Sequence, residues 1–366
     1  SPYLFSAPVI VAALGYFVDI YDLLLFGIVR IPSLISLGLS EEEISVQGAS
    51  ILNWQMAGLL IGGILWGVLG DKKGRLSVLF GSIITYSLAN IACGFVQDPT
   101  TYKLLRFIAG IGLAGELGAG ITLVSEILPK NLRAIGTSLV AGVGLMGAVV
   151  AYFTVEFFDW RYAYFIGGGL GISLLLLRIG VFESGIFANI QNEKHVDKGN
   201  FFSLFTNADR FKKYLRCIGI GMPTWFVIGI LATFSNEFGM ALGIEEPIKP
   251  GLTIMWCYVG LSVGDFVSGF LSHWLESRKK AVLYLMIFTI VFACIYLFAN
   301  IQTAKHLYII TVLLGFGIGY WAMFVTIGAE QFGTNLRATA ATTIPNMVRG
   351  TVIGMTTLFI ALKATF

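Results

Sequence analysis

Charge is what this sequence has least of. Asp, Glu, Lys and Arg together make up 12% of its 366 residues, whereas soluble domains carry about 25%. Hydrophobic residues account for 56%, and the mean hydropathy is +0.82. This composition excludes an ordinary soluble domain and indicates a protein embedded in a lipid bilayer.

Residues that ligate metals or form disulfides are also scarce and scattered. They are His195, His273, His306, Cys93, Cys217, Cys257 and Cys294. This spacing forms neither a zinc site nor a disulfide framework. The sequence has no Walker loop, so we do not expect ATP to drive its activity. Nothing in the charge distribution points to nucleic acid. We therefore expect no enzyme activity, no cofactor, no metal and no nucleic-acid partner.

Apolar runs near the ~20 residues that cross a bilayer are what the sequence has in abundance. They predict eleven spans, at about 6–37, 47–69, 76–96, 103–128, 134–155, 162–182, 214–242, 251–274, 281–299, 306–329 and 338–363. The longest polar connector, 183–213, predicts a cytoplasmic linker between an N-terminal bundle of six helices (1–182) and a C-terminal bundle (214–366). Two equal bundles predict a twelfth helix beyond Phe366. Because the chain begins without Met, we expect it to be trimmed.

Basic residues predict the orientation. If the first helix starts in the cytoplasm, most Lys and Arg fall in loops or helix ends on the inner side, around 72–75, 130–133, 178, 194–216, 278–280 and 337. The outer side holds only Lys103, Arg161, Lys249, Lys305 and Lys363. The positive-inside rule therefore predicts a cytoplasmic N-terminus in a multi-pass protein of the bacterial inner membrane. Three arginines, Arg30, Arg106 and Arg349, fall within the spans.

An internal repeat supports two equivalent halves. The segment "SEILPKNLRA" (125–134) aligns without gaps to "AEQFGTNLRA" (329–338), so that Glu126 matches Glu330 and Arg133 matches Arg337. Both segments follow a Gly-rich span and end on the predicted cytoplasmic side. Weak internal symmetry of this kind is typical of transporters.

Two motifs carry a family resemblance. The loop "GVLGDKKGR" (67–75) is similar to the G-x-x-x-D-x-x-G-R motif between helices two and three of the major facilitator superfamily, and "RFIAGIGLAGE" (106–116) resembles its fourth-helix R-x-x-x-G-x-G pattern. The resemblance implies an all-α integral membrane protein of two pseudo-symmetric six-helix bundles, which transports small molecules by alternating access.

The first span indicates a branch of that family. The stretch "GYFVDIYDLLLFG" (15–27) resembles the metabolite:proton symporters, with Asp19 where Glu is usual. Sugar porters share Asp22 and "SEILP…R", but their double-Gln motif is missing from "GMPTWFVIGILATF" (221–234). Drug–proton antiporters usually place a Pro in the Gly motif of helix five, and "GVGLMGAVVA" (142–151) has none.

Two acids within the first span need an explanation. An Asp at a helix centre costs ~2.5–3.5 kcal/mol on insertion scales. At about 100° per residue, Asp19 and Asp22 lie roughly 60° apart and Arg30 returns close to the face of Asp19. Together with Gly15 and Phe26 they predict a polar stripe that lines the pathway between the halves.

Burial favours the protonated form of a carboxylic acid, and a nearby guanidinium favours the ionised form. We predict that Asp22 carries the proton and that Arg106 is its counter-ion, a pairing that the family resemblance also implies. A static salt bridge is the alternative. Asp19 is either a second carrier or a bond between helices, and the same two readings apply to Glu116.

For substrate binding we expect Arg30 and Arg349, because a guanidinium suits a carboxylate or phosphate. They belong to opposite halves, which would let them grip one small anion. Pro345 and Gly350 are expected to loosen the helix around Arg349, whose alternative partners are Asp265 and Glu116. Further residues that could shape the pocket are Asn53, Gln55, Trp225, Trp256, Tyr320, Trp321 and Asn346.

Charged residues at the predicted cytoplasmic helix ends recur in both halves. They are Asp71, Arg75, Glu126, Arg133, Glu183, Arg278, Glu330 and Arg337. Exposed pairs contribute only ~0.2–1 kcal/mol each, but a network of them can bias two states a few kcal/mol apart. We expect them to close an inner gate, or simply to set the topology.

The sequence thus predicts a monomeric, proton-coupled symporter that imports a small organic anion or zwitterion. A proton-driven exporter or antiporter and an uncoupled sugar facilitator remain alternatives. The buried acids argue against a receptor or an inactive scaffold.

Overall fold

The computed structural model describes residues 4–129, 132–183 and 200–365. Helices and short connections make up this part of the chain. The first half contains α1 (Ala7–Ser36), α2 (Glu41–Lys73), α3 (Arg75–Cys93), α4 (Pro99–Leu113), α5 (Glu116–Ile127), α6 (Arg133–Phe157) and α7 (Trp160–Glu183). The second contains α9 (Ser203–Thr206), α10 (Ala208–Phe226), the π-helical segment η1 (Val227–Ala232), α11 (Ser235–Ala241), α12 (Pro250–Trp274), α13 (Arg278–Phe298), α14 (Ala304–Gly317), α15 (Trp321–Glu330) and α16 (Thr334–Thr365).

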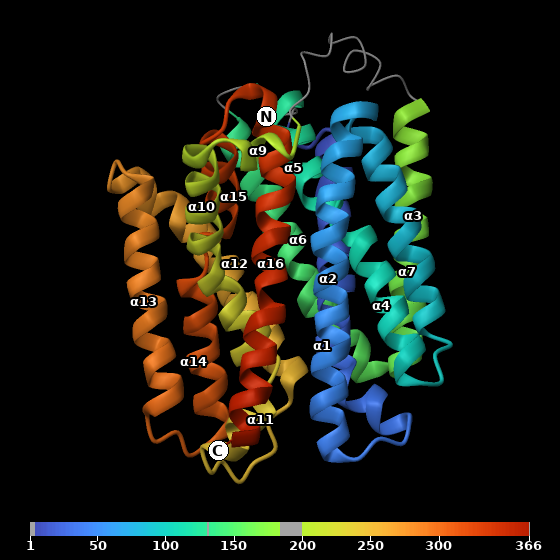
Figure 1. Ribbon diagram of the computed structural model, residues 1–366, viewed down its shortest axis with the longest axis vertical. Helices are drawn as coiled ribbons and strands as arrows, with labels where there is room; N and C mark the ends of the chain where they lie inside the picture. Colours follow the sequence, from blue (N-terminus) through green and yellow to red (C-terminus); the bar gives the residue numbers. More distant parts are fainter. Residues whose placement is uncertain (1–3, 130–131, 184–199, 366) are drawn as a thin grey trace.

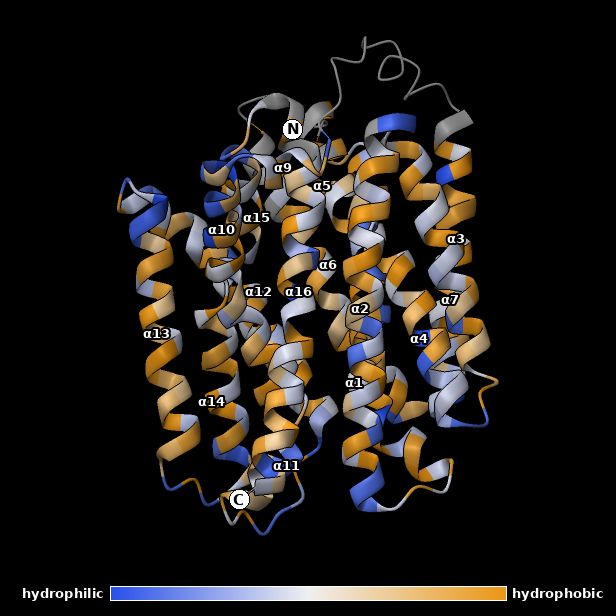
Figure 2. Cartoon of the chain, viewed as in Figure 1, coloured by the Kyte–Doolittle hydropathy of each residue, from blue (hydrophilic) through white to orange (hydrophobic). Residues whose placement is uncertain are grey.

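Eleven helical segments within the described residues are long and apolar enough to cross a membrane. They coincide with the eleven predicted spans, so the all-α membrane fold is confirmed. Figure 2 shows hydrophobic residues along most of their length and hydrophilic residues concentrated towards both ends of the molecule.

Local chemistry fixes where the helices begin and turn. Ser40 and Glu43 form a reciprocal capping box at the start of α2, which satisfies backbone N–H groups that have no partner within the helix. Asp98 caps α4 by accepting from the Thr101 backbone at 2.8 Å, and the hydrogen bonds from Thr101 lower the pKa of the Asp98 carboxyl. Gly74, between α2 and α3, has a φ of +86°. The left-handed backbone explains why the G-x-x-x-D-x-x-G-R loop needs glycine there.

The first and second halves lie side by side (Figure 1). α3, α4 and α7 lie on one side of the view and α13 and α14 on the other, with α2 and α16 between them. Within the halves, α2 packs on α4 and α12 packs on α14. Both pairs approach through glycines: a Cβ on Gly110 would meet the Gln55 carbonyl, and one on Gly315 would meet that of Cys257. Small residues allow such close approach of membrane helices. Across the halves, α2 packs on α16 and α6 on α12.

Three predicted spans are not continuous helices. The fourth is interrupted at 114–115, between α4 and α5, and the tenth at 318–320, between α14 and α15. These interruptions are 204 residues apart, the same offset as between Glu126 and Glu330. The repeat therefore extends to the position of the break. The seventh span contains the π-helical segment η1. By contrast α16 runs without interruption through Pro345, so the expectation that Pro345 and Gly350 loosen it was wrong.

Candidate functional site

The two acids of α1 are fully buried but face different surroundings. A Cβ on Gly167 of α7 would approach Asp22 Oδ1, which places the Asp22 side chain towards the interior of the first half. Asp19 instead experiences Arg349 of the second half as its strongest cationic neighbour. Neither oxygen of either carboxylate has a hydrogen-bond partner among the described residues.

The residues of the predicted stripe on α1 therefore do not face one common surface, and that prediction was wrong. Gly15 faces Arg178 and Glu116, Phe26 makes an edge contact with Tyr102 of α4 at 5.3 Å between ring centroids, and Asp22 faces α7. The five positions fall within an arc of about 80°, but they extend over about 22 Å of the helix. The stripe divides because the helices that pack against α1 differ from one level to the next.

Arg106 lies beside Asp22 without contacting its carboxylate. Its guanidinium donates to Gln55 Oε1 at 2.7 and 3.0 Å, to Asn90 Oδ1 at 2.8 Å and to the Asp22 backbone carbonyl at 3.0 Å. Tyr164 covers it, with the ring centroid 5.6 Å from the Arg106 Cζ. A direct Asp22–Arg106 ion pair is thus absent from this arrangement of the described residues and stays a prediction for another conformation.

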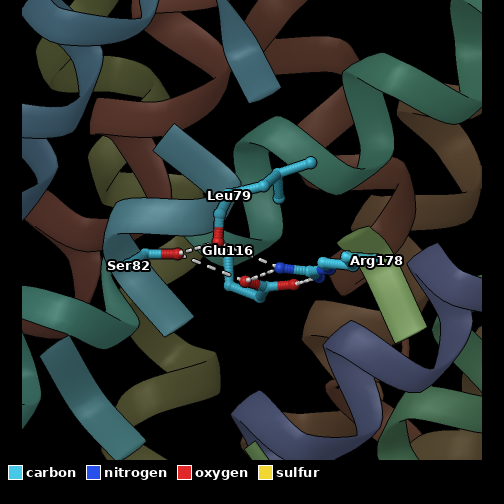
Figure 3. A network of polar contacts seen from close by, with 4 residues as sticks. All are labelled: Leu79, Ser82, Glu116 and Arg178. Carbon is cyan, nitrogen blue, oxygen red and sulfur yellow. Dashed lines mark hydrogen bonds and ion pairs between the residues drawn. The ribbon is translucent and has the colours of Figure 1, made fainter. Parts of the chain in front are cut away.

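Glu116 forms a buried ion pair with Arg178 of α7 (Figure 3). The same carboxylate accepts from Ser82 of α3 at 3.3 Å, and Arg178 also donates to the Leu79 carbonyl at 3.1 Å. Arg178, which the sequence places near a cytoplasmic helix end, is buried, with a side chain only 5% exposed. The nearby acid Glu116 could have been sought as its partner, since a buried arginine requires one.

Arg349 lies at the interface between the halves. Its Cζ is 5.6 Å from the ring centroid of Trp225 and 6.0 Å from that of Trp321, and these two rings pack edge to face. Nη1 donates weakly to Asn346 Oδ1 at 3.4 Å, while Nε has no partner among the described residues. The guanidinium is thus held by aromatic faces and retains hydrogen-bonding capacity.

Arg30 is the second arginine expected to bind substrate. It donates to the Thr233 carbonyl and to Asn236 Oδ1, both at 3.0 Å, and lies 4.7 Å from the ring centroid of Phe234. It stands eleven residues beyond Asp19, or about 16 Å along the helix. Because Arg349 is at the level of Asp19, the structure does not bring the two arginines together.

The remaining candidates lie in four separate places. Gln55 donates to the Leu23 carbonyl at 2.9 Å besides binding Arg106, and Asn53 is partly exposed on the same helix. Asn346 crosses the interface to donate to the Ala114 carbonyl at 2.8 Å. Tyr320 is buried and donates to the Ile220 carbonyl at 2.8 Å within the second half. Trp256 of α12 is 37% exposed.

Asp265 does not pair with Arg349 among the described residues. Its Oδ1 accepts from the Ala322 backbone N–H at 3.3 Å, at the beginning of α15. A carboxylate there complements the positive end of the helix dipole.

Only one of the proposed inner-gate pairs is described, between Arg278 and Glu330 at 2.7 Å, with both side chains about half exposed. The side chains of Asp71, Arg75, Glu126, Arg133, Glu183 and Arg337 lie outside the described residues.

The sequence did not predict a polar cluster at the end of the molecule opposite the Arg278–Glu330 pair. Glu237 of α11 accepts from Ser45 of α2 at 2.8 Å and from Lys363 of α16 at 2.7 Å. Glu237 is buried, and Ser45 belongs to the first half. With Arg30, this cluster joins the halves on the predicted outer side. Its signal in the sequence was weak, because Glu237 and Lys363 stand at the ends of spans, where charges are usual.

Comparison with known proteins agrees with this architecture. The family model of the Major Facilitator Superfamily matches residues 12–364, so the chain belongs to this superfamily, as the motifs predicted. A putative metabolite transport protein of Haemophilus influenzae is 28% identical over 350 residues, which cover 92% of this chain and 84% of that protein. The niacin transporter NiaP of Acinetobacter baylyi is 28% identical, with coverages of 78% and 71%. The gentisate transporter of Corynebacterium glutamicum is 25% identical, with coverages of 88% and 73%. The chain is thus a multi-pass membrane transporter of this superfamily and not an enzyme.

Proposed function

We propose that this protein is a proton-coupled symporter that imports a small organic acid, with a carboxylate bound by Arg349. The observation that carries the proposal is the position of Arg349: a buried guanidinium at the interface of the halves, lined by Trp225 and Trp321 and close to the unpaired Asp19. Members of this superfamily move substrates between two such halves, so this interface is where a substrate is expected.

The chemistry of this site favours a planar carboxylic acid. A guanidinium binds a carboxylate through two parallel hydrogen bonds, and Arg349 Nε is unpaired. The two indole rings offer flat apolar surfaces on which a ring of the substrate can stack. Niacin and gentisate, named for two relatives, are both aromatic carboxylic acids, which supports this class. Asn346, bonded to Arg349, is proposed to orient the guanidinium.

Proton coupling is proposed from the two acids on α1. Both are fully buried and unpaired, and an ionised carboxylate in that position is costly. Protonation removes the cost, so each acid can gain and lose a proton as its access to water changes. Asp22 is proposed as the carrier, with Arg106 poised to stabilise its ionised form. Asp19, facing Arg349, is proposed to link protonation to substrate binding, because the acid competes with the substrate carboxylate for the same guanidinium.

The halves are proposed to rock about this interface. The cluster of Arg30, Ser45, Glu237 and Lys363 joins them on the predicted outer side. The Arg278–Glu330 pair lies on the predicted inner side, among the charged residues proposed to close the inner gate. We further propose that the protein works as a monomer in the bacterial inner membrane with its N-terminus in the cytoplasm. Reporter fusions at loops 94–98 and 275–277 would test the orientation, which an external 275–277 loop would contradict.

The test is uptake into proteoliposomes of the full chain, with and without an inward pH gradient. Labelled nicotinate, gentisate and benzoate would be compared with a neutral sugar and an amino acid. Accumulation of an acid driven by the gradient supports symport. If one net positive charge enters with each substrate molecule, a membrane potential of 100 mV supports roughly fifty-fold accumulation. Accumulation of the sugar alone, or extrusion of the acid against the proton flow, would contradict the proposal.

Two variants assign the roles. Asp22→Asn is expected to abolish pH-driven accumulation while leaving substrate exchange largely intact, because exchange needs no net proton movement. Arg349→Lys is expected to raise the half-saturating concentration of the acid, because Lys loses the bidentate geometry. Trp256→Phe, on an exposed surface, is the matched control.

A further inference from the structure

Buried polar side chains form a column inside the first half, separate from the interface that holds Arg349. We name it the polar column. Ordered from the predicted outer side inwards, its members are Ser33, Tyr102, Tyr164, Arg106, Asn90, Asp22, Tyr86, Ser82, Glu116 and Arg178, and all are buried. From Tyr102 to Glu116 the chain advances fourteen residues along α4 and α5, or about 21 Å. This is most of the ~30 Å hydrocarbon core of a bilayer.

Two helices give the column its shape. On α3, Ser82, Tyr86 and Asn90 are four residues apart and therefore lie on one face. On α7, Gly167 and Gly171 face this region: a Cβ on Gly167 would approach Asp22 and Tyr21, and one on Gly171 would meet Ser87. The glycines thus allow the polar groups of α1 and α3 to pack directly against the backbone of α7, where a larger residue would collide with them.

At its outer end the column is a chain of hydroxyl groups. The hydroxyls of Tyr102 and Tyr164 lie 2.6 Å apart, and Tyr102 donates to Ser33 Oγ at 3.3 Å. Ser33 is one turn from the exposed Ser36. This series of hydroxyl groups therefore starts close to the predicted outer surface and ends at Tyr164, whose ring lies against Arg106.

In its centre the column holds polar atoms without partners. Both Asp22 oxygens, Asn90 Nδ2, Tyr86 Oη and Ser87 Oγ have no hydrogen-bond partner among the described residues. Buried polar groups are normally hydrogen-bonded to protein or water, and a buried water bonds about three of them. So many orphaned groups beside one carboxylate fit a site for water and protons.

The charged and titratable groups that face Asp22 can be named from each neighbouring helix. Arg106 faces it from α4, Tyr86 and Cys93 lie near it on α3, and Asp19 and Tyr21 precede it on α1. Asn90 of α3 lies close enough to interact with its carboxylate, although without hydrogen-bond geometry, and Gln55 of α2 anchors Arg106. Arg349 of the second half acts on the neighbouring acid Asp19.

We propose that the polar column is a proton pathway to Asp22, which lies within the first half and is separate from the substrate route at the interface. The proposal rests on Asp22 being the proton carrier. For inward transfer the hydroxyls turn so that Ser33 donates to Tyr102 and Tyr102 donates to Tyr164. Each oxygen then accepts a proton as it releases its own, so one proton passes from Ser33 through Tyr102 and Tyr164, by way of water, to Asp22. No bond other than O–H forms or breaks. Tyr86 and Ser82 continue the column to Glu116 and Arg178, where the proton leaves.

The test follows Asp22 itself and needs no substrate. The full chain in lipid vesicles is exposed to a rapid drop in external pH, and the carboxylic C=O band of Asp22, assigned by its loss in Asp22→Asn, is recorded by time-resolved infrared spectroscopy. Tyr102→Phe and Tyr164→Phe each keep the ring and remove the hydroxyl. They are expected to slow the appearance of the band about tenfold or more and to increase its solvent isotope effect, without changing its final amplitude.

Tyr296→Phe is the matched control, because the Tyr296 hydroxyl is equally buried and donates only to the Leu231 carbonyl in the second half. It should leave the rate unchanged. Ser33→Ala provides a second interruption that does not alter the aromatic packing. Wild-type rates in both tyrosine variants and in Ser33→Ala would overturn the pathway alone. A wild-type protein in which Asp22 never changes protonation would overturn the proton-carrier proposal and the pathway together.

Discussion

The two broken membrane helices of this protein share a backbone design and differ in chemistry. In the first half the break falls at 114–115, and Glu116 in the first turn of α5 pairs with Arg178. In the second half the equivalent residue is Tyr320, and the acid comes from another helix, since Asp265 of α12 accepts from the first turn of α15. Both halves thus place a carboxylate at the positive end of a short helix, but among the described residues only the carboxylate of the first half pairs with a buried cation.

This difference indicates how the halves have divided their work. Among the described residues, six buried charged side chains lie in the first half and two, Glu237 and Arg349, in the second. Those of the first half are Asp19, Asp22, Arg30, Arg106, Glu116 and Arg178. The second half brings Trp225 and Trp321 against the buried Arg349. A repeat that conserves the helix break while changing the groups around it is consistent with proton handling on one side and recognition of an apolar ring on the other.

The largest expected effect comes from breaking the Glu116–Arg178 pair. Glu116→Gln leaves Arg178 buried without a counter-charge, which should destabilise the protein by about 3–5 kcal/mol. Arg178→Met should cost a similar amount for the opposite reason. The double variant should recover much of the loss, because replacing a whole buried pair by neutral groups is often nearly neutral.

Thermal unfolding in detergent would measure these three variants against the wild type. If the double variant were as unstable as the worse single variant, the loss would not come from breaking the ion pair. The contrast between the halves would then not be explained by the energy of this pair.

The second prediction compares the glycines at the two breaks. A Cβ on Gly319 would collide with the backbone of Gly264 and Asp265, whereas one on Gly115 would meet the side chains of Trp66 and Val78 at 2.9 Å. Side chains can move and backbone cannot, so Gly319→Ala should cost about 1–3 kcal/mol and Gly115→Ala less. The same unfolding assay would decide, and equal losses would contradict the greater rigidity of the second break.

The helical spans and the repeat could be predicted from the sequence because both depend on properties that a linear pattern carries. An apolar run of sufficient length must cross the bilayer as a helix, and the match of Glu126 with Glu330 fixed an offset that the structure extends to the helix breaks. The breaks themselves lie among glycines, at Gly115 and Gly319, but glycine is so frequent in this chain that the residue type alone did not locate them.

The candidate site was harder to predict, because spacing along a helix gives a direction and not a neighbour. Asp19 and Asp22 were correctly placed about 60° apart, yet that angle is enough for one to face Arg349 and the other α7. The pairing of Arg178 with Glu116 was not predicted, because Arg178 is near a helix end and its burial depends on the tilt and depth of α7. Arg30 and Arg349 were joined because they belong to opposite halves, whereas their levels along the helices separate them.

The third prediction concerns the acid at the second break. Asp265→Asn keeps the shape and loses the charge that complements the start of α15, so the expected cost is about 1 kcal/mol or less. This is well below the cost of Glu116→Gln, since no buried cation is left unpaired. A loss from Asp265→Asn as large as that from Glu116→Gln would mean that Asp265 has a cationic partner outside the described residues.

The smallest effect is expected at the exposed pair of the second half. Arg278 and Glu330 are 2.7 Å apart but about half exposed, and such pairs contribute ~0.2–1 kcal/mol. A double-mutant cycle with Arg278→Gln and Glu330→Gln isolates this coupling, and it should weaken further in 1 M salt, where the screening length falls to about 3 Å. The Glu116–Arg178 coupling, measured the same way, should hardly respond to salt because water and ions do not reach it. If the two couplings showed equal salt dependence, the buried character of the first pair would be refuted, and with it the distinction between the halves.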